Sequence, residues 1–531
     1  GIVFLSMDEG KSGATLVSLP ASSAYLKLTY RAQGGLTSYW STHDFAAGAA
    51  GEGHIRDFNG GLTLLAEDVS SEGLRMPFSL SHVYQSELAG TKDPLVRTDP
   101  YTRCGDGWKL SAMQTLEVPY RETDLDDYAY VYTDSDGSRH YFKRDNVTYL
   151  LNGAAKNVSG GTGASYPSAS DEDGLGLFVV PVTEAKLKET YPWKIVNKSG
   201  SSSLYFDRAG RLGMVTDANQ KENGTNASTK EQNRILYTYE TVENGGLEQA
   251  ELEQFRDTLA ALQSGCNDEN WQELLTEANA QEADLKENCP LLGTNYKAAR
   301  QFLVTEQNIK YLTDTPTASV SARTSKTAAA VKAFALVMTE LEGTGEVYDQ
   351  RLVRIEDAVG KATILTYNED GLLASVTEPS DGTVRMQYQY DAEGRLTEIL
   401  DSREEAPSAY SYTEQGLLSR ITDPDGYQIS LGWEEDRVSR LEESVPEGDG
   451  RSSGQAYTIQ HGTDGTVHYR FSGPDDIPGT EDDIENVYSF DEAGKTLSVY
   501  STPVSGTEII GASVYTYTDG TTEGPNKIKE S

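Results

Sequence analysis

A short phrase recurs in this chain, and such repetition limits the architectures that the chain can adopt. Five glycines each have an aromatic residue four positions earlier. The aromatic residues are Phe206, Tyr367, Tyr390, Tyr412 and Phe490, and the glycines are Gly210, Gly371, Gly394, Gly416 and Gly494. Self-similarity of this kind indicates an array of one supersecondary unit, in which each unit contacts its neighbours. Function is therefore expected in the assembled surface rather than in a single pocket.

Each unit has the pattern of a β-hairpin. Alternate residues such as Tyr388 and Tyr390 share one face of a strand, and a Val or Ile five residues after each glycine indicates a second strand. The linking tetrad Asp-x-x-Gly supplies a side-chain cap and a residue that tolerates positive φ, which favours a short hairpin with a bulge. A degenerate unit with a shortened turn is expected at residues 433–441. A lone hairpin cannot bury its face, so the hairpins are expected to pair laterally into one sheet.

The phrase YDAEGRL resembles the YD repeat of Rhs proteins, teneurins and the shell components of insecticidal toxin complexes. Tyr390, Asp391, Gly394 and Arg395 carry this resemblance, whereas other copies depart from the pattern at positions Asn368, Thr413 and Lys495. The resemblance implies a mainly β fold, in which YD-repeat antiparallel β-hairpins form a spiralling sheet or partial shell. It further implies that such a shell often encloses a C-terminal toxin or effector.

Segments before the repeats are similar to the region that precedes them in large secreted DNRLRE-plus-Rhs proteins of Gram-positive bacteria. These segments are 39–40, 60–62, 75–84, 105–108 and 136–142, and residues 25–30 resemble the last strand of a DNRLRE domain. The resemblance implies an internal fragment of a secreted or cell-surface protein. The expected organisation is a tail of a preceding β domain (1–30), a β-rich pre-repeat region ending in a first YD unit (31–240), an α-helical insertion (241–345) and a YD-repeat array (346–531).

The α-helical insertion is predicted from a change of pattern between Leu247 and Glu342. Apolar residues there recur with the spacing of one helix face, whereas the flanking segments 235–239 and 351–355 read as strands. Two interpretations of the insertion stay open. It is either a partner-docking module or a helical plug packed on the edge of the sheet.

The charge of the chain excludes some partners. Lys and Arg number 45 against 83 Asp and Glu, which gives a net charge of −38. Such a surface repels phosphate backbones and anionic membranes, so we expect no binding to nucleic acid. No run approaches the roughly 20 apolar residues that a membrane span requires. The simplest interpretation of the charge is a solvated acidic surface.

One acidic loop predicts a structural Ca²⁺. Its five carboxylates are Asp475, Asp476, Glu481, Asp482 and Asp483. Hard oxygen ligands at this density suit Ca²⁺, whose binding would relieve their mutual repulsion. The alternative is a solvated acidic loop, because charge clusters are commonly exposed. No other cofactor is expected.

Two cysteines of the helical insertion could form a disulfide. Cys266 and Cys289 would then join two antiparallel helices in an oxidising compartment. The alternative is two free buried thiols, since spacing in sequence does not establish proximity.

Motifs of catalysis are weak in this chain. Residues 450–454 match the nucleophile-elbow pattern by letters, but no strand precedes them and no helix follows. The six histidines form no ligand pair at helical spacing. Residues 423–426, Asp-Pro-Asp-Gly, are similar to the motifs that flank the self-cleavage site of Rhs core domains, but they fall at an ordinary repeat turn. We therefore expect the chain not to be an enzyme.

The leading hypothesis is a non-catalytic structural part of a YD-repeat β-shell that encloses or displays a C-terminal effector. Its partner would be the remainder of its own polypeptide. The alternative is a cell-surface adhesin or carbohydrate-binding β scaffold, with glycans or cell-surface receptors as partners. In a shell the repeat tyrosines are buried, whereas in a glycan binder aromatic residues outside the repeat core lie exposed in a row.

Overall fold

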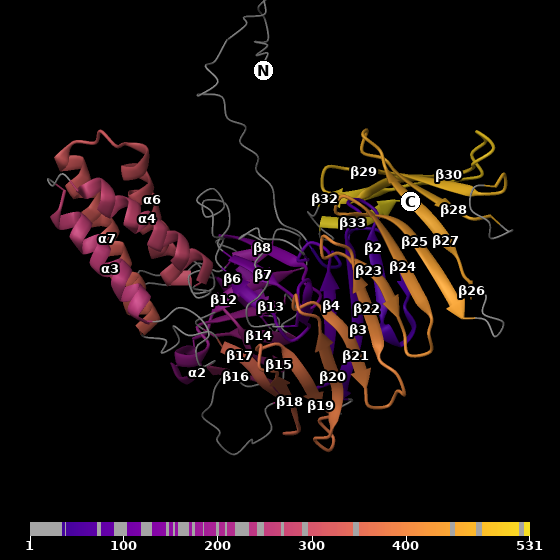
Figure 1. The fold of residues 1–531 in the computed structure, drawn as a ribbon, viewed down its shortest axis with the longest axis horizontal. Coiled ribbons are helices and arrows are strands. Elements are labelled where there is room, and N and C mark those ends of the chain that lie inside the picture. Colours follow the sequence, from indigo (N-terminus) through magenta and orange to yellow (C-terminus); the bar gives the residue numbers. More distant parts are fainter. Residues whose placement is uncertain are drawn as a thin grey trace, which may run out of the picture. The chain divides into compact units, whose positions relative to one another are not determined.

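The chain is mainly antiparallel β structure with one group of long helices, as Figure 1 shows, and this confirms the predicted fold class. The computed structural model describes residues 34–37, 39–71, 76–89, 104–117, 130–144, 148–151, 154–157, 169–171, 176–183, 185–197, 201–207, 210–217, 233–241, 249–266, 270–288, 296–342, 350–446, 452–473, 480–519 and 525–530. The expected tail of a preceding domain, 1–30, lies outside these residues.

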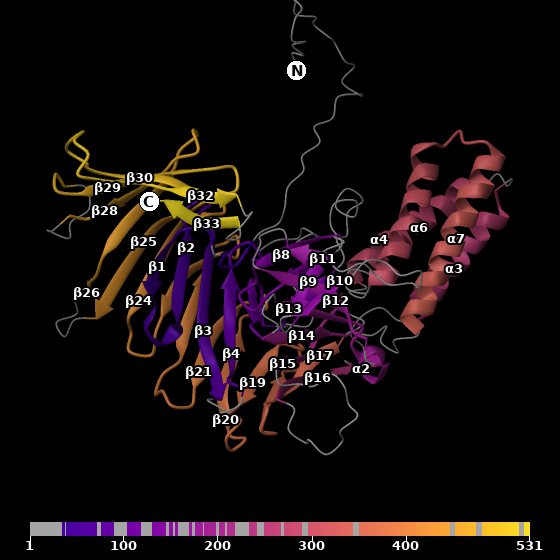
Figure 2. The ribbon, with the colours of Figure 1, turned by 180° about the vertical axis from the view of Figure 1, so that it is seen from behind.

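The first strands form a five-stranded sheet, here called the N-terminal sheet, which is visible in front of the repeat strands in Figure 2. Its strands, in spatial order, are β1 (Thr42–Ala46), β2 (Glu52–Arg56), β3 (Leu62–Ser71), β4 (Phe78–Gln85) and β5 (Trp108–Leu110). The short helix η2 (Gly48–Ala50) joins β1 to β2. A β-bulge between Glu67 and Val69 lets Asp68 join its neighbours in the buried interior.

The next strands close into a barrel. They are β6 (Thr115–Glu117), β7 (Tyr130–Thr133), β8 (Arg139–Arg144), β11 (Ala169–Asp171), β12 (Leu177–Pro181), β13 (Trp193–Asn197), β14 (Ser202–Phe206) and β15 (Leu212–Asp217). A bridge between Thr115 and Arg211 closes the ring, and beside it the Leu116 N–H donates to the Gly210 carbonyl (2.8 Å). Side chains including Phe142 and Phe206 fill the interior. The elements β9 (Thr148–Leu151), β10 (Ala154–Asn157) and α2 (Ala185–Thr190) complete this region.

From β16 onward the strands continue as one ribbon, here called the repeat sheet. They are β16 (Arg234–Thr241), β17 (Gln350–Glu356), β18 (Ala362–Tyr367), β19 (Leu373–Thr377), β20 (Val384–Tyr390), β21 (Leu396–Asp401), β22 (Ser408–Tyr412), β23 (Leu418–Thr422), β24 (Gln428–Glu434), β25 (Arg437–Pro446), β26 (Ser452–Ser453), β27 (Ala456–His461), β28 (Val467–Phe471), β29 (Ile484–Phe490), β30 (Thr496–Pro503) and β31 (Gly511–Val514). Successive strands pair antiparallel, and β25 pairs with both β26 and β27. A two-stranded sheet of β32 (Thr516–Asp519) and β33 (Pro525–Glu530) follows.

The shortened turn expected at 433–441 is the β24–β25 hairpin. Glu434 pairs with Arg437, so only two residues form the turn, and Glu435 there adopts a φ of 57°. Positive φ at this position is typical of the tight turns that join twisted antiparallel strands.

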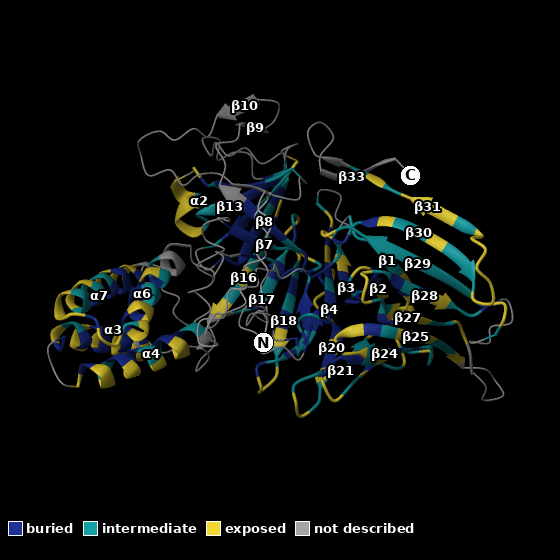
Figure 3. Cartoon of the chain, turned by 90° about the horizontal axis from the view of Figure 1, so that it is seen from above, coloured by how far each residue is buried: buried dark blue, intermediate teal, exposed yellow. Residues whose placement is uncertain are grey.

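The helical insertion consists of α3 (Gln249–Ser264), α4 (Trp271–Asn288), α6 (Tyr296–Asp314) and α7 (Val320–Glu342). Its core contains residues of these helices alone, including Phe255 and Phe334, whose ring centroids lie 4.7 Å apart. Figure 3 shows buried residues facing the interior of the group and exposed residues facing outward. The strands that flank the insertion, β16 and β17, pair directly with each other. None of the described helices is long and apolar enough to cross a membrane.

Candidate functional site

The glycines of the repeat lie in the turns between paired strands, outside the strands themselves. Each has a positive φ, which favours glycine. The values are 80° for Gly210, 77° for Gly371, 77° for Gly394, 87° for Gly416 and 81° for Gly494. The N–H of each glycine donates to the carbonyl three residues earlier, for example from Gly371 to Asn368 (3.0 Å), from Gly416 to Thr413 (3.0 Å) and from Gly494 to Asp491 (3.0 Å). The structure thus places these five residues as turn formers of the hairpins.

The same turns are capped by the residue that follows the aromatic position. The Asp391 carboxylate accepts the backbone N–H groups of Glu393 (3.1 Å) and Arg395 (2.8 Å). In the other copies the capping residue accepts the N–H four residues on, and these residues are Asp207, Asn368, Thr413 and Asp491. The departures at Asn368 and Thr413 keep a side-chain oxygen, which is what the turn requires.

The repeat tyrosine joins each unit to the preceding one. Tyr390 donates its hydroxyl hydrogen to the Leu373 carbonyl (2.9 Å), and Tyr412 donates to the Leu396 carbonyl (2.5 Å). The same contact recurs along the chain in the pairs Tyr239–Leu212, Tyr367–Leu352, Trp433–Leu418 and Tyr517–Thr496, with an indole N–H as the donor in Trp433. Each hydroxyl or indole therefore satisfies a backbone carbonyl next to a turn and fixes the offset between neighbouring hairpins.

The basic residue after the repeat glycine makes a second link. The Arg395 Nε donates to Asp391 (2.7 Å), and the guanidinium lies 5.4 Å from the ring centroid of Tyr412 in the next unit. Desolvation disfavours the Asp391 carboxylate, but the backbone and side-chain hydrogen bonds of Arg395 outweigh it and hold the pKa of Asp391 below its usual value. Equivalent cation–ring contacts occur in the pairs Arg211–Tyr239 and Lys495–Tyr517. Arg351, which does not follow a repeat glycine, makes a similar contact with Tyr367.

The tyrosines two positions earlier in the repeats lie deeper in the same core and contact the N-terminal sheet. Tyr388 and Tyr410 are only 6% and 4% exposed. Tyr388 donates to Asp68 (2.8 Å), the other oxygen of Asp68 lies 2.6 Å from His82 Nδ1, and His82 Nε2 lies 3.3 Å from the Tyr410 hydroxyl. Burial, reinforced by the Asp68 charge, raises the pKa of both tyrosines well above the usual value, so both keep their hydroxyl hydrogen.

Two further aromatic residues connect the same two sheets. Trp108 of β5 donates its indole N–H to the Tyr412 hydroxyl (2.9 Å), and its ring lies 4.9 Å from that of Tyr410. The Tyr84 hydroxyl accepts the backbone N–H of Leu418 (3.0 Å). The apolar side chains of both sheets belong to one continuous core. The N-terminal sheet is therefore part of the repeat structure and not a neighbour of it.

At the far end of the N-terminal sheet, a second group of aromatic residues contacts the repeat sheet. His43 of β1 stacks on Tyr469 of β28 with ring centroids 3.6 Å apart, and its Nδ1 lies 2.5 Å from Asp57. Trp40 donates its indole N–H to the Ala493 carbonyl (2.8 Å) in the turn before β30. Repeat units at both ends of the sheet are thus held by residues more than 300 positions earlier in the chain.

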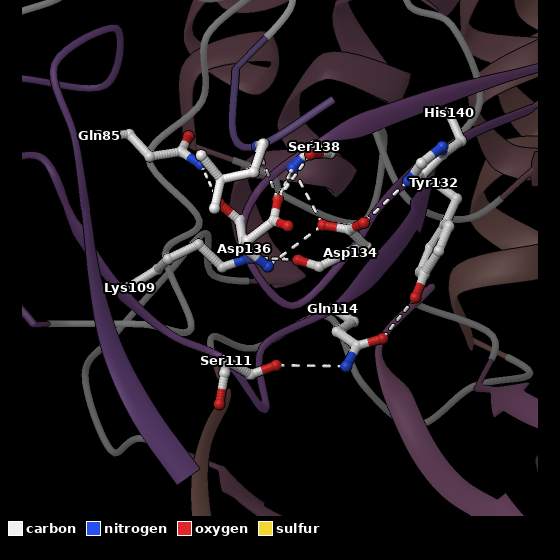
Figure 4. Close-up of polar contacts among 10 residues, drawn as sticks. Gln85, Lys109, Ser111, Gln114, Tyr132, Asp134, Asp136, Ser138 and His140 are labelled. Atoms are coloured by element: carbon white, nitrogen blue, oxygen red, sulfur yellow. Dashed lines mark hydrogen bonds and ion pairs between the residues drawn. The ribbon is translucent and has the colours of Figure 1, made fainter. Parts of the chain in front are cut away.

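Figure 4 shows a polar cluster at the turn between β7 and β8. Asp134 pairs with His140 (2.8 Å), and Ser138 donates its hydroxyl hydrogen to Asp136 (2.6 Å). Burial and the neighbouring Asp134 raise the pKa of Asp136. Asp136 also accepts the Leu36 N–H (3.2 Å), so the cluster holds the segment that enters the N-terminal sheet. These hydrogen bonds stabilise the turn between β7 and β8.

The carboxylates of the predicted Ca²⁺ loop are only partly described. Asp475 and Asp476 lie outside the described residues, Glu481 and Asp482 are exposed, and Asp483 is buried. Asp483 accepts the Gly473 N–H (3.3 Å), and Asp482 accepts the Thr480 hydroxyl (2.5 Å). The Ca²⁺ site stays a prediction.

The predicted disulfide also stays a prediction. Cys266 is buried at the end of α3, and its sulfur lies 3.4 Å from both the Leu262 carbonyl and the Thr327 hydroxyl. Cys289 falls in a segment that the structure does not describe.

The Asp-Pro-Asp-Gly segment forms an ordinary repeat turn. The Tyr427 N–H donates to the Asp423 carboxylate (2.8 Å), as Arg395 does to Asp391 in the neighbouring unit. Gly426 adopts a φ of 88°, like the other repeat glycines. The geometry is shared with turns that lack the proline.

Comparison with known proteins identifies the repeats. The RHS Repeat family model matches residues 367–406 and 390–428. Among solved structures, TcdB2-TccC3 without its hypervariable C-terminal region aligns at 15% identity over 32% of this chain and 9% of that chain, with a TM-score of 0.24. TcdB2-TccC3 aligns at 10% identity over 93% of this chain and 21% of that chain, also with a TM-score of 0.24. The Tc holotoxin pore of Photorhabdus luminescens, with a mutation in TccC3, aligns at 9% identity over 87% and 22%, with a TM-score of 0.16.

A search of curated proteins gives no match. The chain spans no more than 22% of the solved chains named above. Within the matched residues the side-chain cap of the turn and the bond from the repeat tyrosine to a backbone carbonyl recur from unit to unit. RHS repeats are therefore present in residues 367–428 of this chain.

Proposed function

We propose that this chain is a non-catalytic structural segment of a YD-repeat β-shell that encloses or displays a C-terminal effector, in a secreted or cell-surface protein. Its parts would be the tail of a preceding domain (1–30), a pre-repeat region (31–240), the helical insertion (241–345) and the repeat array (346–531). The remainder of the same polypeptide would be its partner.

The proposal rests on one observation, which is that the repeat tyrosines contact other parts of the chain. The hydroxyls of Tyr390 and Tyr412 bond to backbone carbonyls, and Tyr388 and Tyr410 are buried against the N-terminal sheet. Side chains that join neighbouring hairpins in this way stabilise a continuous sheet, as a shell requires. They leave few groups of the repeat core for contact with a substrate or a soluble ligand.

Protection from protease in the complete natural protein tests enclosure. The complete protein is digested with trypsin, and the peptides that follow Ser531 are followed by mass spectrometry. In the wild type these peptides should survive, and in the double variant Tyr388→Ala/Tyr410→Ala they should be cleaved, because removal of two buried rings opens the shell. Tyr500→Ala, at an exposed position, is the control and should behave as wild type. Equal cleavage in wild type and double variant would contradict enclosure.

A carbohydrate-binding role is the second candidate, and one observation favours it. Phe58 is 37% exposed, Trp40 lies beside it with ring centroids 6.4 Å apart, and neither belongs to a repeat tyrosine position. Aromatic faces of this kind can stack on sugars. A glycan array probed with the wild type and with Phe58→Ala tests this role, which requires a glycan signal that the variant loses.

A further inference from the structure

The β1–β2 hairpin carries three potential metal ligands on one face. Asp44 of β1 stands directly opposite His54 of β2, and Glu52 lies two residues before His54 on the same strand. Directly opposite and alternate positions share one face of a sheet, so the three side chains converge. One donor atom from each of the three lies within 4.8 Å of the other two. The His54 Nδ1 is already 2.6 Å from Asp44 Oδ1.

A buried hydroxyl on the same face of the sheet, across from His54, supports a ligand there. Thr63 of β3 is the direct partner of His54 on the other side of β2, so it shares the same face. Thr63 is fully buried, and its hydroxyl has no hydrogen-bond partner among the residues that the structure describes. Buried hydroxyls ordinarily find a partner, and a water molecule held by a metal ion would supply one.

We propose that Asp44, Glu52 and His54 bind a divalent transition metal ion of the Zn²⁺ class, with water in the remaining position. One imidazole nitrogen and two carboxylate oxygens form a donor set that Zn²⁺ accepts, and three protein ligands leave one tetrahedral position open. The imidazole separates this site from a Ca²⁺ site, which takes oxygen ligands. The ion takes the place of the proton between His54 and Asp44, and the ring then keeps its proton on the other nitrogen.

The site has a structural consequence for the repeat sheet. β1 is the outermost strand of the N-terminal sheet, and its opposite face carries His43, which stacks on Tyr469 of β28. A metal ion that joins β1 to β2 would therefore fix the strand that holds the later repeats. Metal binding would stabilise the native chain by mass action, because the unfolded chain does not bring the three ligands together.

Titration of the metal-stripped 531-residue chain with ZnCl₂ tests the proposal, with Co²⁺ absorption as the readout of a tetrahedral site. One ion should bind per chain. Affinity should fall at least about tenfold in Glu52→Gln and in His54→Ala, since even supporting residues of metal sites contribute on this scale. His468→Ala is the matched control, because His468 also lies near a carboxylate, Glu485 (3.6 Å), without a third ligand among the described residues. It should bind as the wild type does.

Three results would overturn the proposal. The first is absence of Zn²⁺ binding below about 100 µM in the wild type. The second is equal affinity in the wild type, Glu52→Gln and His54→Ala, which would place the ion elsewhere. The third is binding of Ca²⁺ in preference to Zn²⁺ through the same residues. Glu52 is exposed, so its conservative variant should fold even if His54→Ala does not.

Discussion

The repeat sheet and the helical insertion bury their apolar side chains in different ways. The insertion has a local core, formed by residues between Leu252 and Met338. The repeat sheet shares its core with the N-terminal sheet, so Tyr410 meets His82 across 328 positions of sequence. The insertion can therefore be a self-supporting module, whereas the repeats depend on a distant segment. This difference also explains how the insertion is tolerated, since β16 and β17 pair as if it were absent.

The largest effect is expected from Asp68→Ala. Asp68 is buried and bonds to both His82 and Tyr388, so its removal leaves two buried polar groups without their partner. The free energy of unfolding of the repeat sheet should fall by about 3–5 kcal/mol. Denaturant unfolding followed by tryptophan fluorescence measures this loss.

Asp44→Ala in metal-stripped protein is the control for that prediction. Asp44 also pairs with a histidine, but it is 51% exposed, so the expected loss is below about 1 kcal/mol. Equal losses of unfolding free energy in the two variants would mean that the buried bonds of Asp68 between the sheets contribute no more stability than an exposed pair does.

A pair of core substitutions tests whether the two cores are independent. Leu396→Ala should destabilise the repeat sheet by about 2–5 kcal/mol, and Phe334→Ala should destabilise the helical insertion by about 3–5 kcal/mol. Circular dichroism at 222 nm reports mainly the helices. Near-ultraviolet dichroism in the tryptophan region reports mainly the sheets, because four of the five tryptophans lie outside the insertion. Each variant should shift one transition and leave the other in place. A shift of both transitions by either variant would contradict the separation.

A smaller effect is expected from Tyr412→Phe. The hydroxyl of Tyr412 donates to the Leu396 carbonyl and accepts the Trp108 indole N–H, so the change removes both bonds and leaves the ring in place. We expect a loss of about 1–3 kcal/mol in the free energy of unfolding. Tyr500→Phe, at a position that is 38% exposed, should change it little. Indistinguishable melting curves for the two variants would show that the hydrogen bonds between units do not contribute to the free energy of unfolding.

The smallest effect concerns pH. The pKa of Asp391 is lowered in the folded chain, so its contribution is present above the ordinary carboxyl pKa of about 4 and is lost as pH falls through the lower folded value. Asp391→Asn keeps a side-chain cap like that of Asn368 but loses the charge. The stability difference between wild type and variant should therefore shrink below about pH 4. A difference that stays constant from pH 7 to pH 3 would rule out the charged pair as its source.

The hairpins and their turns could be predicted because their determinants are local. The Asp-x-x-Gly tetrad and the alternating apolar residues lie within a few positions of each other, and they indicate β18 to β25 directly. The helical insertion was predictable for the same reason, since its apolar spacing is that of one helix face. Both depend on periodicity within a short window.

The contacts of the N-terminal sheet could not be predicted in this way. A β-bulge places Asp68 in the interior, and no alternating pattern signals it. The grouping of Asp44, Glu52 and His54 depends on which strands pair, whereas a search for ligands at helical spacing does not find it. A search for ligands at opposite positions of neighbouring strands could have found this group of three residues. The partner of Asp68, more than 300 positions away, gives no local signal.

Hydrogen exchange measured by mass spectrometry tests whether the repeat sheet and the N-terminal sheet form one cooperative structure. The wild type is compared with the double variant Tyr388→Phe/Tyr410→Phe, which removes the two hydroxyls near Asp68 and His82. If the two sheets do, peptides of β3–β5 and of β18–β24 should lose protection together, while peptides of α3–α7 keep theirs. Loss confined to the two substituted hairpins, or loss that spreads to the helices, would contradict this prediction.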